Sequence, residues 1–324
     1  MRLLVTGGAG FIGSNFVRRV FDGTFAGISS VVVLDRLTYA GNPQNLAGLE
    51  GKHGYQFIQG DICDSDLVQQ LVENVDAIVN FAAESHVDRS IMDATDFIKT
   101  NVNGVHSLLE AIKRSGRKIR LIQVSTDEVY GSIENGSWNE NSPLMPNSPY
   151  SASKASGELL ARAYHLTHQL DVVITRSSNN YGPYHYPEKL IPLFITNLIE
   201  GKKVPIYGAG SQIRDWLHVD DHCKGIYLVL LNGAAGEIYN IGGGRECTNY
   251  ELTKLLLKIM NKSENSIAYV EDRKGHDFRY SINWGKINEN LKYTPEVNFE
   301  KGLIETIQWY QENQWWWKPL KRGL

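Results

Sequence analysis

The chain has 324 residues, which is long enough for one large domain or two moderate ones with a substantial core. Hydrophobic residues make up 42% and charged residues 21%, close to the averages of soluble globular proteins, so disorder over most of the chain is not expected. The formal net charge of -3 gives no electrostatic reason to expect a nucleic acid or an anionic membrane as the main partner.

Three cysteines lie far apart in the sequence. An odd, scattered set of this kind is typical of a reduced, intracellular protein rather than of a disulfide scaffold. Cys63, Cys223 and Cys247 also lack the CxxC or Cys/His spacing of zinc sites, so we predict no metal site. Since no apolar stretch reaches the length of a membrane span, the expected location is the cytoplasm.

Short apolar runs alternate with amphipathic helical patterns through the first half of the chain. This alternation is typical of a doubly wound parallel sheet with helices on both faces. The predicted fold class is therefore α/β of the Rossmann type. The expected strands cover residues 2–6, 31–35, 55–59, 77–82, 121–125 and 172–175, and the expected helices cover 12–21, 96–115 and 148–170.

The pattern changes after about residue 180, where three prolines fall close together. A helix is predicted at 192–200 and a strand at 204–207, and residues 238–241 again have the pattern of a buried strand. The tryptophan-rich C-terminus is expected to form a packed helix.

These segments predict two unequal parts. We expect a Rossmann domain at residues 1–180, to which segments at about 210–245 return. We expect residues 181–324 to form a smaller, mainly substrate-binding domain.

The first expected strand ends in a glycine-rich turn, GGAGFIG, at residues 7–13. Gly7, Gly10 and Gly13 fit a GxxGxxG pattern, and a GxGxxG pattern begins at Gly8. Such glycines allow a sharp turn, let the backbone approach a pyrophosphate, and pack the next helix against the sheet. The N–H groups at the start of that helix then bind the phosphates. Because the motif lies between a strand and a helix, we favour a dinucleotide site over glycines that serve only a tight turn.

Two acidic residues end the next two strands. Asp35 follows Gly13 by 22 residues, where a carboxylate accepts hydrogen bonds from the adenosine ribose and repels a 2′-phosphate. Asp35 therefore favours NAD over NADP. For Asp61 the sequence leaves two interpretations open, contact with the adenine amine or a simple helix cap.

Tyr150 and Lys154 form a Tyr-x-x-x-Lys pair on an expected helix, so their side chains share one face. A lysine beside a phenol stabilises the phenolate, which predicts a lowered Tyr150 pKa and a base for a sugar hydroxyl. The alternative is an exposed Tyr/Lys helix face, but the pair comes one loop after a strand end that carries further polar groups.

That strand ends in STDEVYG at residues 125–131. Ligands of open parallel sheets bind beyond the carboxyl ends of the strands, where Thr126, Asp127 and Glu128 are expected to lie. Neighbours on an extended strand point to opposite faces, so both carboxylates can serve one substrate only if the chain turns here, for example into a short helix. The alternative is that one carboxylate caps the turn while the other faces solvent.

Taken together, these motifs resemble the extended short-chain dehydrogenase/reductase family and, within it, the dTDP-glucose 4,6-dehydratases. The resemblance covers essentially the whole chain. The matching segments are TGGAGFIG, AAESHVDRSI (82–91), STDEVYG, YSASK, RSSNNYGPYHYPEKLIP (176–192), PIYG (205–208), IRDWLHVDDH (213–222), YNIGGG (239–244) and DRKGHD (272–277). Lys274 is a departure, since the family usually has proline there.

The resemblance implies a hydro-lyase that makes a 4-keto-6-deoxy sugar for deoxysugar biosynthesis, such as that of rhamnose. Tyr150 would take the proton from the hydroxyl on carbon 4 while NAD accepts the hydride, with Lys154 and Thr126 in support. Glu128 would remove the proton on carbon 5, and protonated Asp127 would donate to the hydroxyl leaving carbon 6. The hydride would then return to carbon 6, so NAD should stay bound.

The resemblance also assigns binding roles and a homodimer. Residues 96–115 and 148–169 of each subunit would form a four-helix bundle, and we give structural roles to His86, His185, His218 and His222. The residues expected at NAD are Gly7, Gly10, Phe11, Ile12, Gly13, Asp35, Asp61, Ile62, Ala82, Tyr150, Lys154 and Asn180. Those expected at dTDP-glucose are Ser85, Thr126, Asn179, Lys189, Leu190, Arg214, Asn249, Arg273 and His276.

Several alternatives remain. Another enzyme of the same fold is possible: an epimerase, a sugar-nucleotide decarboxylase, or a dehydratase of a UDP or GDP sugar. Asp127 argues against the first two, since neither needs an acid to expel a hydroxyl. A nonenzymatic NAD-sensing protein would have no need of Tyr150, Lys154 and both carboxylates. Thymine and uracil differ by one methyl group, which physical reasoning alone does not resolve.

Overall fold

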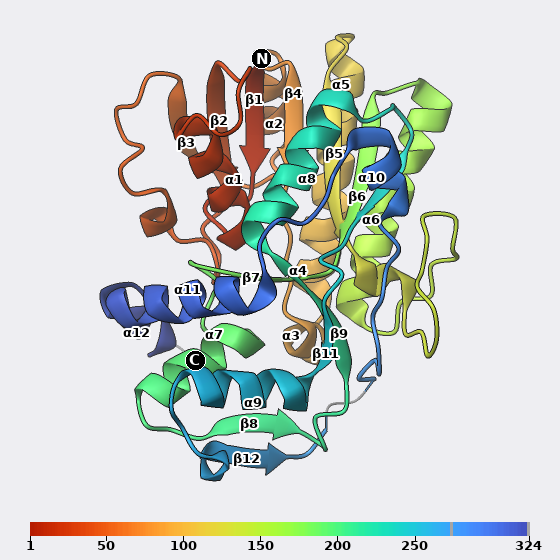
Figure 1. The fold of residues 1–324 in the computed structure, drawn as a ribbon. Coiled ribbons are helices and arrows are strands. Elements are labelled where there is room, and N and C mark those ends of the chain that lie inside the picture. Colours follow the sequence, from red (N-terminus) through yellow and green to blue (C-terminus); the bar gives the residue numbers. More distant parts are fainter. Residues whose placement is uncertain (273–274, 323–324) are drawn as a thin grey trace.

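The computed structural model describes residues 1–272 and 275–322. Its larger sheet has seven parallel strands in the order β10-β6-β5-β4-β1-β2-β3, with helices on both faces (Figure 1). This is the predicted doubly wound Rossmann-type sheet. The strands are β1 (Arg2–Thr6), β2 (Ser30–Asp35), β3 (Tyr55–Gln59), β4 (Ala77–Asn80), β5 (Arg120–Thr126), β6 (Val172–Ser177) and β10 (Ile238–Ile241).

Helices cover this sheet because its strands are apolar on both faces. One hydrophobic cluster joins α1 and α8 to one face, and another joins α2, α5 and α6 to the other. The helical segments of this part are α1 (Phe11–Phe21), η1 (Pro43–Leu46), α2 (Ser65–Val72), α3 (Val87–Met92), α4 (Thr95–Ile98), η2 (Lys99–Gly104), α5 (Val105–Ser115), η3 (Asp127–Tyr130), α6 (Pro149–His168), α8 (Val219–Asn232) and α10 (Gly285–Leu291).

The remaining elements lie below the carboxyl ends of these strands in Figure 1 and enclose a third hydrophobic cluster. They include a three-stranded sheet in the order β11-β9-β7 and a parallel pair, β12-β8. The elements are β7 (Asn179–Tyr181), α7 (Leu190–Ile199), β8 (Val204–Tyr207), β9 (Ile213–His218), β11 (Glu246–Thr248), α9 (Asn249–Ile259), η4 (Glu264–Ser266), β12 (Ile267–Val270), α11 (Phe299–Glu312) and α12 (Gln314–Lys321).

Strand β10 returns from the second half of the chain to the edge of the large sheet. It pairs in parallel with β6, with Ile238 opposite Ile174 and Ile241 opposite Ser177. The buried strand predicted at residues 238–241 is therefore confirmed.

The predicted packed C-terminal helix is also found, since Trp316 and Trp317 of α12 are buried. The Trp316 indole donates to Asn45 Oδ1 at 2.8 Å.

The helix predicted at residues 96–115 is interrupted. Segments α4 and α5 are helical, but a π-helical turn, η2, lies between them. Asn101 lies on this turn, and its side-chain amide donates to the Glu84 carbonyl at 3.0 Å and to the Ser153 hydroxyl at 2.8 Å. The wider turn orients Asn101 for these buried bonds and places Thr100 at the pocket described below.

Among the described residues, no helix has the length and apolar character needed to cross a bilayer.

Candidate active site

A cavity of about 460 Å³ lies at the carboxyl ends of the large sheet's strands, where open α/β sheets bind ligands. It brings together residues from most of the chain length. Of the expected site residues, those that line it are Gly7, Gly10, Phe11, Ile12, Gly13, Asp35, Asp61, Ile62, Ala82, Ser85, Thr126, Asp127, Glu128, Tyr150, Lys154, Asn179, Asn180, Lys189, Leu190, Arg214, Asn249 and His276. Arg273 and Lys274 lie outside the described residues.

The glycine turn has the close approach that a dinucleotide needs. Gly7 has φ of +66°, and a Cβ there would lie 2.5 Å from the Ala82 nitrogen. A Cβ on Gly13 would lie 2.4 Å from the Gly7 carbonyl oxygen, so helix α1 packs tightly against the turn. No side chain in the described ranges caps α1, and its first turn holds no acidic residue. Its N–H groups and positive dipole end therefore suit a pyrophosphate.

Asp35 and Asp61 end neighbouring strands at this cavity. Asp35 accepts hydrogen bonds from the backbone N–H groups of Ala9 and Leu37, both at 2.8 Å, which orients its carboxylate. Asp61 accepts from the Cys63 N–H at 2.9 Å, and the N-cap of α2 is Asp64 rather than Asp61. The residues of this half of the cavity therefore fit an adenosine dinucleotide without a 2′-phosphate.

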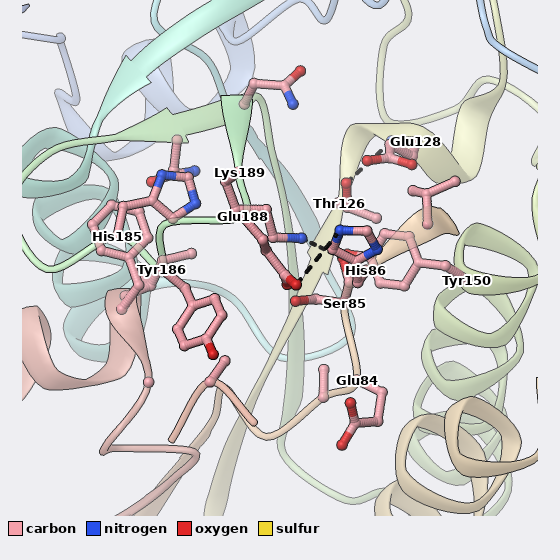
Figure 2. A pocket seen from close by; sticks show the side chains of 18 of the residues that line it. Glu84, Ser85, His86, Thr126, Glu128, Tyr150, His185, Tyr186, Glu188 and Lys189 are labelled. Atoms are coloured by element: carbon pink, nitrogen blue, oxygen red, sulfur yellow. Dashed lines mark hydrogen bonds and ion pairs between the residues drawn. The ribbon is translucent and has the colours of Figure 1, made fainter. Parts of the chain in front are cut away.

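The chain turns after β5 as the two carboxylates require. Residues 127–130 form the 3-10 helix η3, and Thr126 caps it by accepting from the Glu128 N–H at 3.2 Å. Neither carboxylate is the cap. Thr126, Glu128 and Tyr150 lie on one side of the pocket, with His185 and Tyr186 on the other (Figure 2).

Asp127 is almost completely buried. Burial, followed by the charges of Glu128 and Asp215, raises its pKa well above the usual value for a carboxyl. Its Oδ1 accepts from the Thr126 hydroxyl at 3.2 Å, while its buried Oδ2 has no hydrogen-bond partner within the described part of the chain. Asp127 is therefore suited to carry a proton at neutral pH and to donate it.

Tyr150 does not have the lowered pKa expected from the sequence. Burial raises it well above its usual value, and the charges of Glu128 and Asp127 raise it further. The prediction was wrong because it considered the lysine alone and not the two carboxylates facing the same pocket. A positively charged ring bound beside Tyr150, such as oxidised nicotinamide, would lower the Tyr150 pKa, since a nearby positive charge stabilises a phenolate.

Lys154 is buried on the same face of α6 as Tyr150. Its ammonium donates to the Val124 carbonyl at 2.7 Å. Burial lowers its pKa to about 8, and the carboxylate of Glu158 counteracts part of this shift. Lys154 is therefore mostly protonated at neutral pH.

The expected substrate residues that the structure describes line the same pocket. The Lys189 ammonium donates to the Ser85 carbonyl at 2.8 Å and so bridges the segments after β4 and β7. Arg214 stacks on the Tyr280 ring at 4.3 Å, and its guanidinium donates to the Asp277 carbonyl at 3.0 Å. Arg214 also donates to the Ile213 carbonyl at 2.8 Å, and it brings a positive charge to the pocket that suits an anionic group.

The structure adds pocket residues that were not predicted. Glu84 and Glu188 line the pocket as buried carboxylates whose pKa values are raised by burial. Arg89 donates to Glu188 at 2.9 Å and stacks on the Tyr39 ring at 4.0 Å. Glu84 and Glu188 lie inside motifs that the sequence displays, but no spacing rule links residues so far apart.

All four histidines given structural roles make local contacts, and His86 and His185 also line the pocket. His86 and His218 cap helices α3 and α8 by accepting backbone N–H groups. His185 stacks on Phe11 at a ring distance of 4.2 Å, and His222 contacts Asn180 through its Nδ1 at 2.9 Å. Burial lowers the pKa of both His185 and His222 to about 3, so these two are neutral. Within residues 1–272 and 275–322, no three His, Cys, Asp or Glu side chains are grouped as metal ligands would be.

A family model described as GDP-mannose 4,6 dehydratase matches residues 4–306. The chain belongs to this family. Within the dehydratase family, a dTDP-glucose 4,6-dehydratase from Streptomyces niveus is 57% identical over 323 residues, which are 99% of this chain and 96% of the relative. The resemblance inferred from the motifs is thus confirmed over the whole length.

Solved structures show the same fold. A crystal structure of DesIV, a dTDP-glucose 4,6-dehydratase from Streptomyces venezuelae with NAD and a second ligand bound, superposes with a TM-score of 0.97 at 57% identity. The match covers 99% of this chain and 100% of that one. A UDP-glucose 4-epimerase from Thermotoga maritima is more distant, with a TM-score of 0.89 and 30% identity over 97% of this chain and 100% of the epimerase.

Proposed function

We propose that this protein is an NAD-dependent hydro-lyase that converts dTDP-glucose into dTDP-4-keto-6-deoxyglucose, a precursor of deoxysugars. The observation that carries the proposal is the turn after β5, which directs Asp127 and Glu128 toward the pocket that holds Tyr150. An epimerase needs no acid to expel a hydroxyl. The dTDP-glucose 4,6-dehydratases that are 52–57% identical to this chain support the choice of nucleotide.

Each step requires one proton to move. Tyr150, once it is ionised, accepts the proton of the 4-hydroxyl, and Thr126 lines the same pocket. The ketone acidifies carbon 5, from which Glu128 takes a proton. Asp127 gives its proton to the 6-hydroxyl, so the bond from carbon 6 to oxygen breaks and water leaves. Glu128, whose proton exchanges with solvent, then protonates carbon 5. Release of one proton from Tyr150 and uptake of one by Asp127 return both side chains to their starting states.

NAD, when bound, supplies the oxidation at carbon 4 and the reduction at carbon 6, with no net redox change. The residues proposed to hold it are those of the glycine turn, Asp35, Asp61, Ile62, Ala82, Asn180, Tyr150 and Lys154. The protonated Lys154 places a positive charge near the phenol that must lose its proton. We propose that Ser85, Asn179, Lys189, Leu190, Arg214, Asn249, Arg273 and His276 bind the sugar nucleotide.

A single incubation tests this function. Purified protein mixed with dTDP-glucose, with no added cofactor, should give a product lighter by one water, with deuterium at carbon 5 when the solvent is deuterium oxide. Mass spectrometry and NMR measure both. No mass loss with dTDP-, UDP- or GDP-sugars, even with added NAD, would overturn the dehydratase assignment. Conversion of a UDP- or GDP-sugar alone would overturn only the choice of base.

We also propose that the protein is a cytoplasmic homodimer. Its three cysteines are free thiols, as expected in a reducing compartment. Helix α6 exposes Leu159 (52%) and Leu166 (60%), which are seven residues apart and lie on one face, and Ile98 on α4 is 53% exposed. A second copy of this face would cover these side chains.

Arginine at Leu159 and Leu166 should therefore convert a dimer into a monomer, because charges cannot be buried unpaired in an apolar interface. Sedimentation velocity measures the change. Met145→Arg is the matched control, since Met145 is 64% exposed on a loop outside this face. A double variant that sediments like the wild type would contradict the proposed interface.

A further inference from the structure

A buried ion pair lies directly behind the pocket. Arg176 on β6 is 3% exposed and Glu158 on α6 is 1% exposed, and neither lines the cavity. The Arg176 Nε donates to both Glu158 carboxylate oxygens at 3.1 and 3.2 Å, and the Nη2 donates to Oε1 at 2.5 Å. A buried ion pair seldom stabilises a fold more than apolar side chains of the same volume would. Its position therefore suggests a role other than stability.

Arg176 connects the ion pair to η3, the turn that carries Asp127 and Glu128. The Arg176 Nη1 donates to the Tyr130 hydroxyl at 2.6 Å, and its guanidinium lies 4.6 Å from the centre of the Tyr130 ring. The hydroxyl then donates to Asn240 Oδ1 at 2.8 Å. Tyr130 is fully buried and is the last residue of η3, two positions after Glu128. The end of η3 is thus fixed to strands β6 and β10.

Glu158 connects the ion pair to α6, the helix that carries Tyr150 and Lys154. Glu158 follows Lys154 by four residues and Tyr150 by eight, so the three side chains lie along one face of α6. The Glu158 charge opposes the loss of the Lys154 proton that burial favours. The ion pair therefore contacts both halves of the catalytic apparatus, the turn through Tyr130 and the helix through Glu158.

We propose that Arg176 and Glu158 are positioning residues for the dehydration, with Tyr130 as the link between them and η3. This link fixes Asp127 and Glu128 at the correct distance from Tyr150 and Lys154. The inference rests on the proposed function. Loss of the link should shift the acid and base relative to the sugar, while the residues that bind the nucleotide stay in place. It should therefore slow the elimination more than it weakens binding.

Tyr130→Phe tests this link, because it removes one hydroxyl and keeps the ring that stacks on Arg176. The expected result is a fall in kcat of about 10- to 100-fold, the scale of a small misplacement of reacting groups, with KM nearly unchanged. In a single turnover, the absorbance of reduced nicotinamide should appear at close to the normal rate and decay slowly, and solvent deuterium should enter carbon 5 slowly.

Tyr293→Phe is the matched control. Tyr293 is also fully buried, and its hydroxyl donates to the Gly242 carbonyl at 3.1 Å, away from η3. The inference is overturned if Tyr130→Phe slows the elimination no more than Tyr293→Phe does, or if it raises KM while kcat is retained. Wild-type protein that gives no product would instead overturn the proposed function, and this inference with it.

Glu158→Gln tests the role of Glu158 independently. Without the carboxylate, Lys154 should lose its proton at a lower pH, so the alkaline fall of kcat should begin at lower pH than in the wild type. If kcat falls at the same alkaline pH as in the wild type, and the variant has a native circular dichroism spectrum, the proposed role of Glu158 is excluded.

Discussion

Replacing Tyr150 with phenylalanine should lower kcat by about 10²–10⁴-fold, the range expected for loss of a positioned acid–base group. The ring would remain packed against Phe97, at a centroid distance of 6.3 Å, so the pocket should keep its shape. The variant lacks the oxygen that accepts the 4-hydroxyl proton, and the first step should therefore fail. Mixing with dTDP-glucose should give almost no absorbance of reduced nicotinamide, while calorimetry should show near-normal binding of dTDP.

Tyr164→Phe provides a control on the same helix. The Tyr164 hydroxyl donates to Glu110 at 2.7 Å outside the pocket, so its loss should leave kcat within about twofold, as a surface change usually does. If Tyr150→Phe retained more than a tenth of wild-type kcat, another group would have to accept the proton.

Asp127→Asn should retain the oxidation but lower the rate of water loss by about 10²–10⁴-fold. An amide has nearly the shape of a protonated carboxyl, yet it has no proton to transfer to the leaving hydroxyl. Reduced nicotinamide should therefore accumulate after mixing with dTDP-glucose. Glu128→Gln should also block elimination. Because this variant lacks the base at carbon 5, solvent deuterium should not enter that carbon. Normal turnover in either variant would contradict the assigned roles.

The same Asp127 variant gives a stability test with a definite sign. Because the folded-state pKa of Asp127 is raised, the native state holds its proton over a range where the unfolded chain, with a pKa of about 3.9, has lost it. Wild-type stability should therefore decrease as pH rises from about 4 toward the folded-state pKa. Asp127→Asn removes this contribution, so its stability relative to the wild type should increase over that window in urea titrations. A constant difference would mean that Asp127 is ionised when folded.

Much of the site could be predicted because its signals are local. The glycine turn joins a strand to a helix within one short segment, and Tyr150 and Lys154 are one helical turn apart. The requirement that the chain turn after Thr126 followed from strand geometry alone, and η3 meets it. Residue type and spacing carry this information before any tertiary contact forms.

The rest depends on contacts between distant segments. Glu188 meets Arg89 across 99 residues, and neither residue has a neighbour in sequence that indicates the other. The π-helical turn carries Asn101, whose bonds to Glu84 and to Ser153 on α6 are not encoded by helical periodicity. The raised Tyr150 pKa likewise depends on how close Glu128 lies in the folded chain.

The place of β10 at the end of the large sheet has a consequence for biosynthesis. Strand β6 is buried along its whole length, and its outer edge is completed only by residues 238–241. During translation, a long stretch of chain must emerge from the ribosome while that apolar edge stays unpaired. Unpaired edges of this kind recruit other strands, so the nascent chain is most prone to aggregate in this interval. Stalling or truncation between β6 and β10 should therefore yield insoluble protein rather than a stable half-molecule.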